Sequence, residues 1–238
     1  MKKESFQDLI LLENDDYIFI NKPPFFSTLK DRHEDADVLS LAKVYWPQAQ
    51  VCHRLDKETS GVLAIAKHAE AYRYLSIQFE ERRVKKIYHA VVEGRHQFDR
   101  TKVDLPIFIP TKGLVRIDYN GKSAESYFTT LKEFHHYTLV LCEPITGRTH
   151  QLRIHLATLR ASIAGDTSYG GRLVYLSSIK RNFNLKKNTE EEPLIKRIAL
   201  HAFSLQFPMP NGETISIESP YPKDFQALIR QLEKNNKK

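Results

Sequence analysis

Short apolar runs of strand length, interrupted by proline and glycine, recur along most of this 238-residue chain. Residues 17–20 form one run that ends before Pro23, and residues 62–66 and 87–92 form two more. Apolar runs of this length, bounded by turn residues, are typical of buried strands. Residues 102–143 continue the pattern, so the sequence predicts a β-rich fold.

Helical periodicity is confined to four stretches. We expect the first to begin with Asp37 as its N-cap, a favourable capping residue, and to end at Tyr45. The others cover 70 to about 83, 149–160 and 225–232, where apolar residues recur at helical spacing. Several strands interleaved with few helices predict an α+β fold, in which helices and loops flank a largely antiparallel central sheet.

The chain has no internal repeat and no Gly/Ser-rich linker, so we expect one domain over residues 1–238. The polar segment 177–196 is predicted to be a long loop or insertion, and residues 234–238 a basic tail. The Asn-Gly pair at 120–121 is a hairpin signal.

Composition narrows the class of protein. No apolar run approaches the ~20 residues that a membrane-spanning helix needs, so we expect no membrane association. The first twenty residues are too acidic for a signal peptide, and Cys52 and Cys142 lack metal-type spacing, which indicates a cytoplasmic protein. A net charge of +7 favours a polyanionic partner.

The familiar motifs for nucleotide cofactors and metals are missing or incomplete. The Gly121-Lys122-Ser123 sequence ends like a phosphate-binding loop, but Arg116 stands where that loop needs glycine. There is no G-x-G-x-x-G sequence, and the ten histidines show no metal-ligand spacing. We therefore expect no nucleotide cofactor and no metal.

The segment 53–61, His-Arg-Leu-Asp-Lys-Glu-Thr-Ser-Gly, places an acid and a cation two residues apart. If its first part is extended, Arg54 and Asp56 point to the same side, because strand side chains alternate. A carboxylate beside a guanidinium stays ionised at neutral pH and can act as a nucleophile. The same pair also fits a structural ion pair on the surface, so these residues alone leave both interpretations open.

Two more segments carry donor side chains. Tyr88 lies near cations on the strand predicted over 87–92, and residues 147–155 form a turn that leads into the third helix. Arg153 is expected beside the apolar stripe of that helix, which consists of Leu152, Leu156 and Leu159. With Asp56, these segments offer an acid, a flat ring for stacking a base, and guanidinium groups.

Five motifs, taken in order, resemble those of pseudouridine synthases of the RluA-type branch. They are His53-Arg54-Leu55-Asp56 with Ser60-Gly61, Lys86-x-Tyr88-x-Ala90-x-Val92-x-Gly94, Gly147-Arg148-Thr149-His150-Gln151-Leu152-Arg153-Ile154-His155, Gly165-Asp166-x-x-Tyr169-Gly170-Gly171 and Leu200-His201-Ala202. The resemblance covers about residues 9–225. It implies the pseudouridine synthase fold, with an active-site cleft across a mixed, largely antiparallel sheet.

The resemblance implies an isomerase that converts specific uridines of tRNA or rRNA to pseudouridine, without cofactor or metal. Such enzymes cleave the N1–C1′ bond, rotate the uracil and rejoin it through C5. Asp56 then corresponds to the catalytic aspartate, Tyr88 to the tyrosine beside the target base, and Arg153 to the basic partner of the aspartate. The expected substrate-binding residues are Arg54, His53, Lys86, Arg148, His150 and Gln151.

The chemistry fits these residue types, because cleavage develops positive charge at C1′ and an ionised carboxylate stabilises or traps it. Attack at C1′, attack on the base and a glycal-type intermediate all stay open. Relatives often carry an N-terminal RNA-binding module, but about eight residues precede Leu9 here. We therefore expect the basic surface of the catalytic domain itself to bind a compact RNA, such as a tRNA stem-loop or an exposed rRNA hairpin. We also expect a monomer.

Two alternatives compete with this function. A non-catalytic RNA chaperone could use the same fold, but it would not require Asp56. A hydrolase of nucleosides or glycosides is more distant, because that class normally uses a second catalytic carboxylate and no matched motif supplies one.

Overall fold

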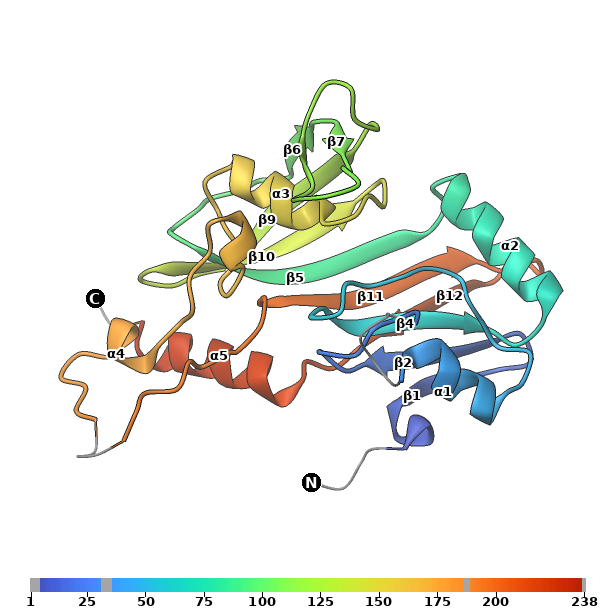
Figure 1. Cartoon of the computed structure of the whole chain (residues 1–238), viewed down its shortest axis with the longest axis horizontal. Helices are drawn as coiled ribbons and strands as arrows, with labels where there is room; N and C mark the ends of the chain where they lie inside the picture. The colour runs from blue at the N-terminus through green and yellow to red at the C-terminus, as the bar shows by residue number, and fades with distance from the viewer. Residues whose placement is uncertain (1–4, 31–35, 186–188, 237–238) are drawn as a thin grey trace. The chain divides into compact units, whose positions relative to one another are not determined.

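The computed structural model describes residues 5–30, 36–185 and 189–236. The chain divides into two compact units, which we call the first unit (residues 1–87 and 201–220) and the second unit (residues 88–200 and 221–238). Figure 1 shows the elements of both. The expectation of a single domain stays a prediction.

The first unit is built on a sheet in which β1, β2, β4 and β11 are neighbours in this order, with β12 paired to β11 and β3 to β4. Only the β4–β11 pair is parallel. Its elements are a 3-10 helix at Phe6–Leu9, β1 Ile10–Glu13, β2 Tyr17–Lys22, α1 Val38–Tyr45, β3 Gln50–Val51, β4 Ser60–Ala66, α2 Ala69–Glu80, β11 Leu200–Pro208 and β12 Thr214–Glu218.

The core of the first unit lies between the sheet and α2. Tyr17 and Phe19 of β2 share a buried cluster with Val62 and Ala64 of β4 and with Leu75 of α2. Because alternate strand residues share a face, one face of β2 and β4 packs against the helix. All seven residues of β4 are buried, so this strand is covered on both faces.

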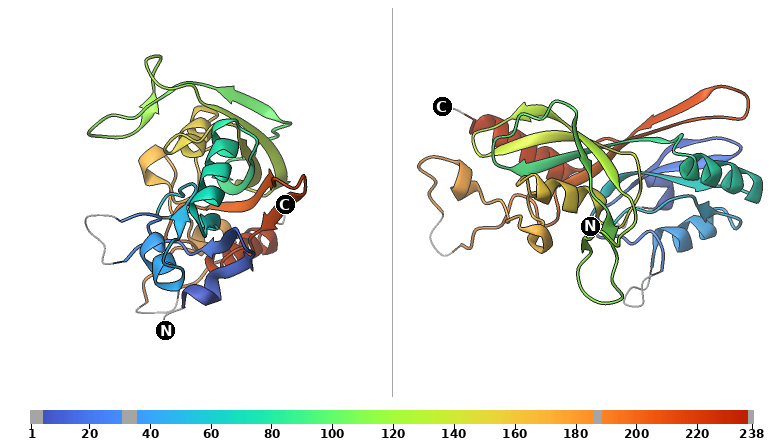
Figure 2. Two further views of the ribbon diagram at one scale, coloured as in Figure 1. Left: turned by 90° about the vertical axis from the view of Figure 1, so that its right-hand side faces the viewer. Right: turned by 90° about the horizontal axis from the view of Figure 1, so that it is seen from above.

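The second unit contains an antiparallel sheet in the order β5, β10, β9, β6, and a separate β7–β8 pair. In both views of Figure 2 the β7–β8 segment projects from the sheet of its unit. The elements are β5 Lys85–Glu93, which begins in the first unit, β6 Thr101–Asp104, β7 Ile107–Phe108, β8 Arg116–Ile117, β9 Glu125–Glu133, β10 Tyr137–Pro144, α3 Gln151–Thr158, a 3-10 helix at Thr167–Tyr169, α4 Leu176–Ile179 and α5 Lys223–Lys234.

The helices of the second unit bury apolar side chains in one cluster with the sheet. Phe225, Leu228 and Leu232 of α5 are buried there, as the helical spacing predicts. Leu152 and Leu156 of α3 join the same cluster. The mixed, mostly antiparallel strand pairing with flanking helices confirms the α+β prediction.

Two local expectations were wrong. The helix over 151–158 does not have one buried stripe, because residues 151–156 are all buried and Leu159 is only half-buried. The Asn120-Gly121 pair forms a turn, in which the Gly121 N–H donates to the Asp118 carbonyl. The segments on either side of that turn both pair with Ile107 instead of with each other, so the turn does not close a hairpin.

The polar segment 177–196 agrees with the loop prediction over most of its described length. It begins in α4, and residues 180–185 and 189–199 have no helix or strand. Residues 186–188 and the last two residues of the basic tail lie outside the described residues. Among the helices of the described residues, none is long and apolar enough to cross a membrane.

Candidate active site

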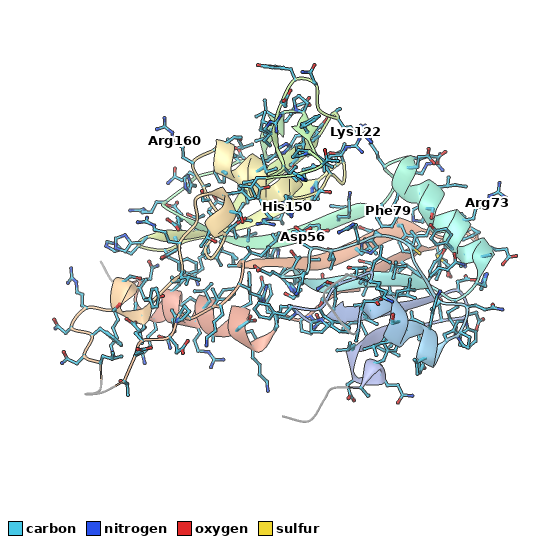
Figure 3. The ribbon with its side chains drawn as sticks, viewed as in Figure 1. Asp56, Arg73, Phe79, Lys122, His150 and Arg160 are labelled. Carbon is cyan, nitrogen blue, oxygen red and sulfur yellow. The ribbon has the colours of Figure 1, made fainter. Side chains whose placement is uncertain are left out.

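Asp56 lies in the loop between β3 and β4 of the first unit and is half-buried (Figure 3). The residue before it is held by a buried threonine. The Thr28 hydroxyl donates to the Leu55 carbonyl over 3.0 Å and accepts from the Leu55 N–H over 3.2 Å. This reciprocal pair fixes both backbone polar groups of Leu55, which fixes the direction in which the chain enters Asp56.

The residue after Asp56 is held by a buried lysine. The Lys22 side chain is fully buried, and its ammonium donates to the carbonyls of Pro23 (2.9 Å), Phe26 (2.8 Å) and Lys57 (3.2 Å). An ammonium has three N–H donors, so these three carbonyls match its full capacity. The Asp56 backbone is therefore clamped on both sides by side chains from the N-terminal part of the chain.

Ser60-Gly61 pairs with His201-Ala202 in the first unit. They form the parallel β4–β11 pair, with Ser60 opposite His201 and Gly61 opposite Ala202. The Ser60 hydroxyl lies 2.9 Å from His201 Nδ1, and His201 Nε2 lies 3.1 Å from the carbonyl oxygen of Ser219. Because a serine hydroxyl can donate to Nδ1 while Nε2–H donates to the carbonyl, a neutral imidazole satisfies both contacts.

Gly61 makes this close pairing possible. Its φ is +119°, a conformation that L side chains rarely adopt, and a Cβ built there would lie 2.1 Å from the Ala202 carbonyl oxygen. Glycine is thus required by the approach of β11 to the strand that follows the Asp56 loop.

The pKa values of His53 and Lys86, both in the first unit, are shifted from their ordinary values. His53 Nε2 accepts the Ala64 N–H over 3.1 Å, and its ring lies 4.9 Å from that of Phe79. Burial, helped by the Lys86 charge, lowers the pKa of His53 to about 3, so the imidazole is neutral at pH 7. Burial, together with Arg82, also lowers the pKa of Lys86 to about 8. Arg54 is exposed.

Tyr88 lies on β5 in the second unit, opposite Cys142 of β10. Its ring packs partly against the core cluster of that unit and is otherwise half-exposed. One side of the ring is thus supported by protein, which suits an aromatic side chain that packs against a base.

Gln151 anchors the start of α3. Its Oε1 accepts from the Thr146 hydroxyl (2.7 Å) and the Arg148 N–H (2.9 Å). Its Nε2 donates to the Glu125 carbonyl and the Ser126 hydroxyl, both at 2.9 Å. All four hydrogen-bonding positions of this buried amide are used inside the protein, which favours a structural role.

His150 and Arg148 lie beside this anchor. His150 precedes α3 with a φ of 55° and places Nδ1 2.9 Å from the Tyr169 hydroxyl (Figure 3). The Arg148 Nε donates to the Ser123 carbonyl over 3.1 Å. Both side chains are half-buried, and their assignment to substrate binding stays a prediction.

Arg153 has a partner that the sequence interpretation did not assign. Its Nε and Nη2 donate to the two carboxylate oxygens of Asp166 over 2.7 and 2.8 Å. The Tyr169 ring lies against the same guanidinium, 4.9 Å from Cζ to the ring centroid. Asp166 and Tyr169 belong to the fourth motif of the resemblance, which was the only sequence signal that could have identified them.

No group of three histidine, cysteine, aspartate or glutamate side chains within the described part of the chain is arranged to hold a metal ion.

A family model described as RNA pseudouridylate synthase matches residues 16–158. Among curated proteins, the ribosomal large subunit pseudouridine synthase C of Vibrio parahaemolyticus is 31% identical, and the match covers 99% of this chain and 72% of that protein. The proteins with the same name from Salmonella typhi and Escherichia coli K12 are 34% and 33% identical, each over 97% of this chain and 72% of the relative.

Two solved human structures have the same fold. Human RNA pseudouridylate synthase domain containing 1 superposes with a TM-score of 0.72 at 27% identity, over 93% of this chain and 87% of that one. Human RNA pseudouridylate synthase domain containing 4 gives a TM-score of 0.70 at 25% identity, over 96% and 95% of the two chains.

Proposed function

The chain belongs to the RNA pseudouridylate synthase family and is an isomerase that acts on RNA, and from this premise we propose that Asp56 performs its chemistry on uridines of large-subunit ribosomal RNA. The relatives described above are named for the large ribosomal subunit, which supports this choice of RNA. The enzyme acts as a monomer.

Isomerisation breaks the N1–C1′ bond and forms the C5–C1′ bond. The proton at C5 leaves and N1 gains one, so no oxidant, reductant or further reactant is consumed. The Asp56 carboxylate meets the positive charge that develops at C1′ when the uracil departs. Attack at C1′, attack on the base and a glycal route each place an ionised carboxylate beside the ribose or the ring, so Asp56 serves in all three.

Tyr88 and Arg153 complete the catalytic set. The Tyr88 ring packs against the uracil, and its hydroxyl assists removal of the C5 proton. Arg153 supplies fixed N–H donors for the charge that develops as the bond breaks. Arg54 occupies the place that the target base leaves when it is extruded from the RNA.

The two clamps on the Asp56 backbone are the observation that carries this proposal. Buried Thr28 holds the residue before Asp56, and buried Lys22 holds the residue after it. A catalytic side chain must be held within a fraction of an ångström of its productive position, and hydrogen bonds from buried side chains to the neighbouring backbone help to achieve this. A surface ion pair would need no such support.

Asp56→Asn tests the chemistry. The substitution keeps the shape and removes the charge, so tritium release from 5-tritiated uridine RNA should fall by about three orders of magnitude or more. RNA binding, measured by filter retention, should stay within about threefold, since the fold is unchanged. Tyr88→Phe should keep binding and lower the rate, because only the hydroxyl is lost.

Glu58→Gln provides the matched control, because it removes one negative charge from the same turn. Its tritium release should stay within about threefold of the wild type. Wild-type release by Asp56→Asn would sink the proposal, and the alternative of an RNA chaperone would then be favoured if binding persisted.

Chemical adduct sequencing of RNA from cells with and without this protein tests the target. The expected result is the loss of one or more pseudouridines from large-subunit rRNA alone. Loss confined to tRNA or to small-subunit rRNA would contradict the choice of RNA without touching the chemistry.

A further inference from the structure

Asp166 is a buried carboxylate that the proposed chemistry does not use. It is 1% exposed, and both of its oxygens accept N–H groups of Arg153. A bidentate contact of this kind fixes the plane of the guanidinium as well as its position, because two parallel bonds leave no freedom to rotate.

Tyr169 restrains the same guanidinium from its face. The Tyr169 hydroxyl donates to the Val115 carbonyl over 3.1 Å, and the contact with His150 Nδ1 is 2.9 Å long. A phenol has one proton, so a hydroxyl that donates to Val115 accepts from His150 Nδ1–H. The two bonds fix the ring that lies 4.9 Å from Arg153 Cζ.

The turn that carries both residues is itself tightly held. The Asp166 carbonyl accepts from the N–H groups of Tyr169 (3.1 Å) and Gly171 (2.8 Å). A Cβ at Gly171 would lie 2.0 Å from the Ile163 carbonyl oxygen, so the turn closes only with glycine there. The Gly-Asp-x-x-Tyr-Gly-Gly sequence therefore builds one rigid support with an acid on one edge of Arg153 and a ring on its face.

Pairing with Asp166 also changes the electrostatic field and the number of hydrogen-bond donors that Arg153 can present to a substrate. A buried ion pair is close to neutral overall, so its long-range field is small compared with that of a lone guanidinium. The guanidinium has five N–H donors and the Asp166 contacts use two of them. The contact with Asp166 therefore fixes the direction of the remaining N–H donors of Arg153.

We propose that Asp166 and Tyr169 are positioning residues, which hold the Arg153 guanidinium in the single orientation that the isomerisation requires. The inference rests on the proposed catalytic function of Arg153. It assigns the fourth motif to catalysis through Arg153, and not to RNA binding.

A double-mutant cycle in the full-length protein tests this. Arg153→Gln, Asp166→Asn and the double variant are compared by kcat and KM for tritium release, with kcat expressed per folded molecule from circular dichroism. Asp166→Asn should lower kcat about 30-fold and leave KM within about threefold. The double variant should have the kcat of Arg153→Gln within about twofold, because a residue that acts only through another adds nothing once its partner is gone.

Asp224→Asn is the matched control. Asp224 makes the same bidentate contact with buried Arg197 in the same unit, at 2.7 and 3.0 Å, and the proposed chemistry does not use it. It should lower the urea midpoint and leave kcat per folded molecule within about twofold. This separates the loss of a buried ion pair from the loss of a catalytic orientation.

The outcomes separate the two hypotheses. If Arg153→Gln is as fast as the wild type, the proposed function of Arg153 is wrong, and the inference that depends on it is wrong as well. If Arg153→Gln is slow but Asp166→Asn is fast, or if their effects on kcat multiply in the double variant, positioning alone is overturned. If Asp166→Asn does not fold, Tyr169→Leu replaces it in the same cycle, with an expected kcat loss of about tenfold.

Discussion

Replacing Gly61 by alanine tests how the β4–β11 contact supports the Asp56 loop. The new Cβ would lie 2.1 Å from the Ala202 carbonyl oxygen and 2.7 Å from its carbonyl carbon. Both are backbone atoms in a paired strand, so neither can move away as a flexible side chain would. The strands must separate, or Gly61 must leave its φ of +119°.

The cost has two parts. An L residue at positive φ is destabilised by about 1–2 kcal/mol, and overpacking at a site that cannot yield adds about 1–3 kcal/mol. The expected loss is therefore about 2–5 kcal/mol, a large part of the 5–15 kcal/mol that is typical for a domain of ordinary stability. Gly212→Ala is the control, since Gly212 has a φ of +85° in the same unit and an added Cβ would meet no atom within 4 Å.

Urea unfolding followed by tryptophan fluorescence measures both variants. Gly212→Ala should lose about 1–2 kcal/mol, and Gly61→Ala should lose more by the overpacking contribution. Tritium release per folded molecule should also fall in Gly61→Ala alone, because β4 follows the Asp56 loop directly. Equal urea midpoints for the two variants would refute the argument that the approach of Ala202 is what requires glycine at 61.

Three further changes probe other supports of the site. Lys22→Met leaves three partly buried carbonyls without their ammonium and should lower the free energy of unfolding by about 3 kcal/mol, measured by urea unfolding. Gln151→Met removes a buried amide with four partners and should cost about 2–3 kcal/mol in the same assay, with unchanged midpoints arguing against the anchor. His53 has a folded pKa of about 3 and an unfolded pKa of about 6.5, so between these values only the unfolded chain binds the proton, and stability falls as pH is lowered through this window. His53→Gln, whose amide oxygen can still accept the Ala64 N–H, should make the urea midpoint less sensitive to acid, and an unchanged pH dependence would count against a buried neutral imidazole.

Short-range sequence signals were sufficient to predict those helices whose ends and buried faces depend on neighbouring residues. Asp37 caps α1 with its carboxylate on the Ser40 N–H, as expected for an aspartate before an apolar periodic run. The spacing of Phe225, Leu228 and Leu232 predicted α5 and its buried face. Each of these features depends on residues within about one or two helical turns.

Such short-range signals could not predict which residues of α3 are buried. Its polar residues are buried because each finds a partner that is distant in sequence: Gln151 reaches Ser126, Arg153 reaches Asp166, and His155 lies between Ser126 and the Leu105 carbonyl. Periodicity treats these residues as solvent-facing, because it counts hydrophobicity and cannot represent a satisfied buried polar group. The motif at residues 147–155 therefore indicated that these residues are needed, but it did not indicate that they are buried against distant partners.

The motif residues fall into two groups, those that are buried and those that are accessible to a substrate. Gly61, His201 and Gln151 are required by close approach or by filled hydrogen bonds inside one unit, so packing and hydrogen bonding are enough to explain these residue types. Asp166 is buried as well, but its bidentate contact also orients Arg153. Arg54 is exposed, and Asp56 and Tyr88 are half-exposed, so all three are accessible to a substrate. A charged or aromatic side chain that is supported from behind and accessible in front is what extrusion and isomerisation of a base demand. Substitution of a supporting residue should therefore lower stability, or lower kcat through Arg153. Substitution of an accessible residue should instead either weaken RNA binding, as expected for Arg54, or slow the bond-breaking step, as expected for Asp56 and Tyr88.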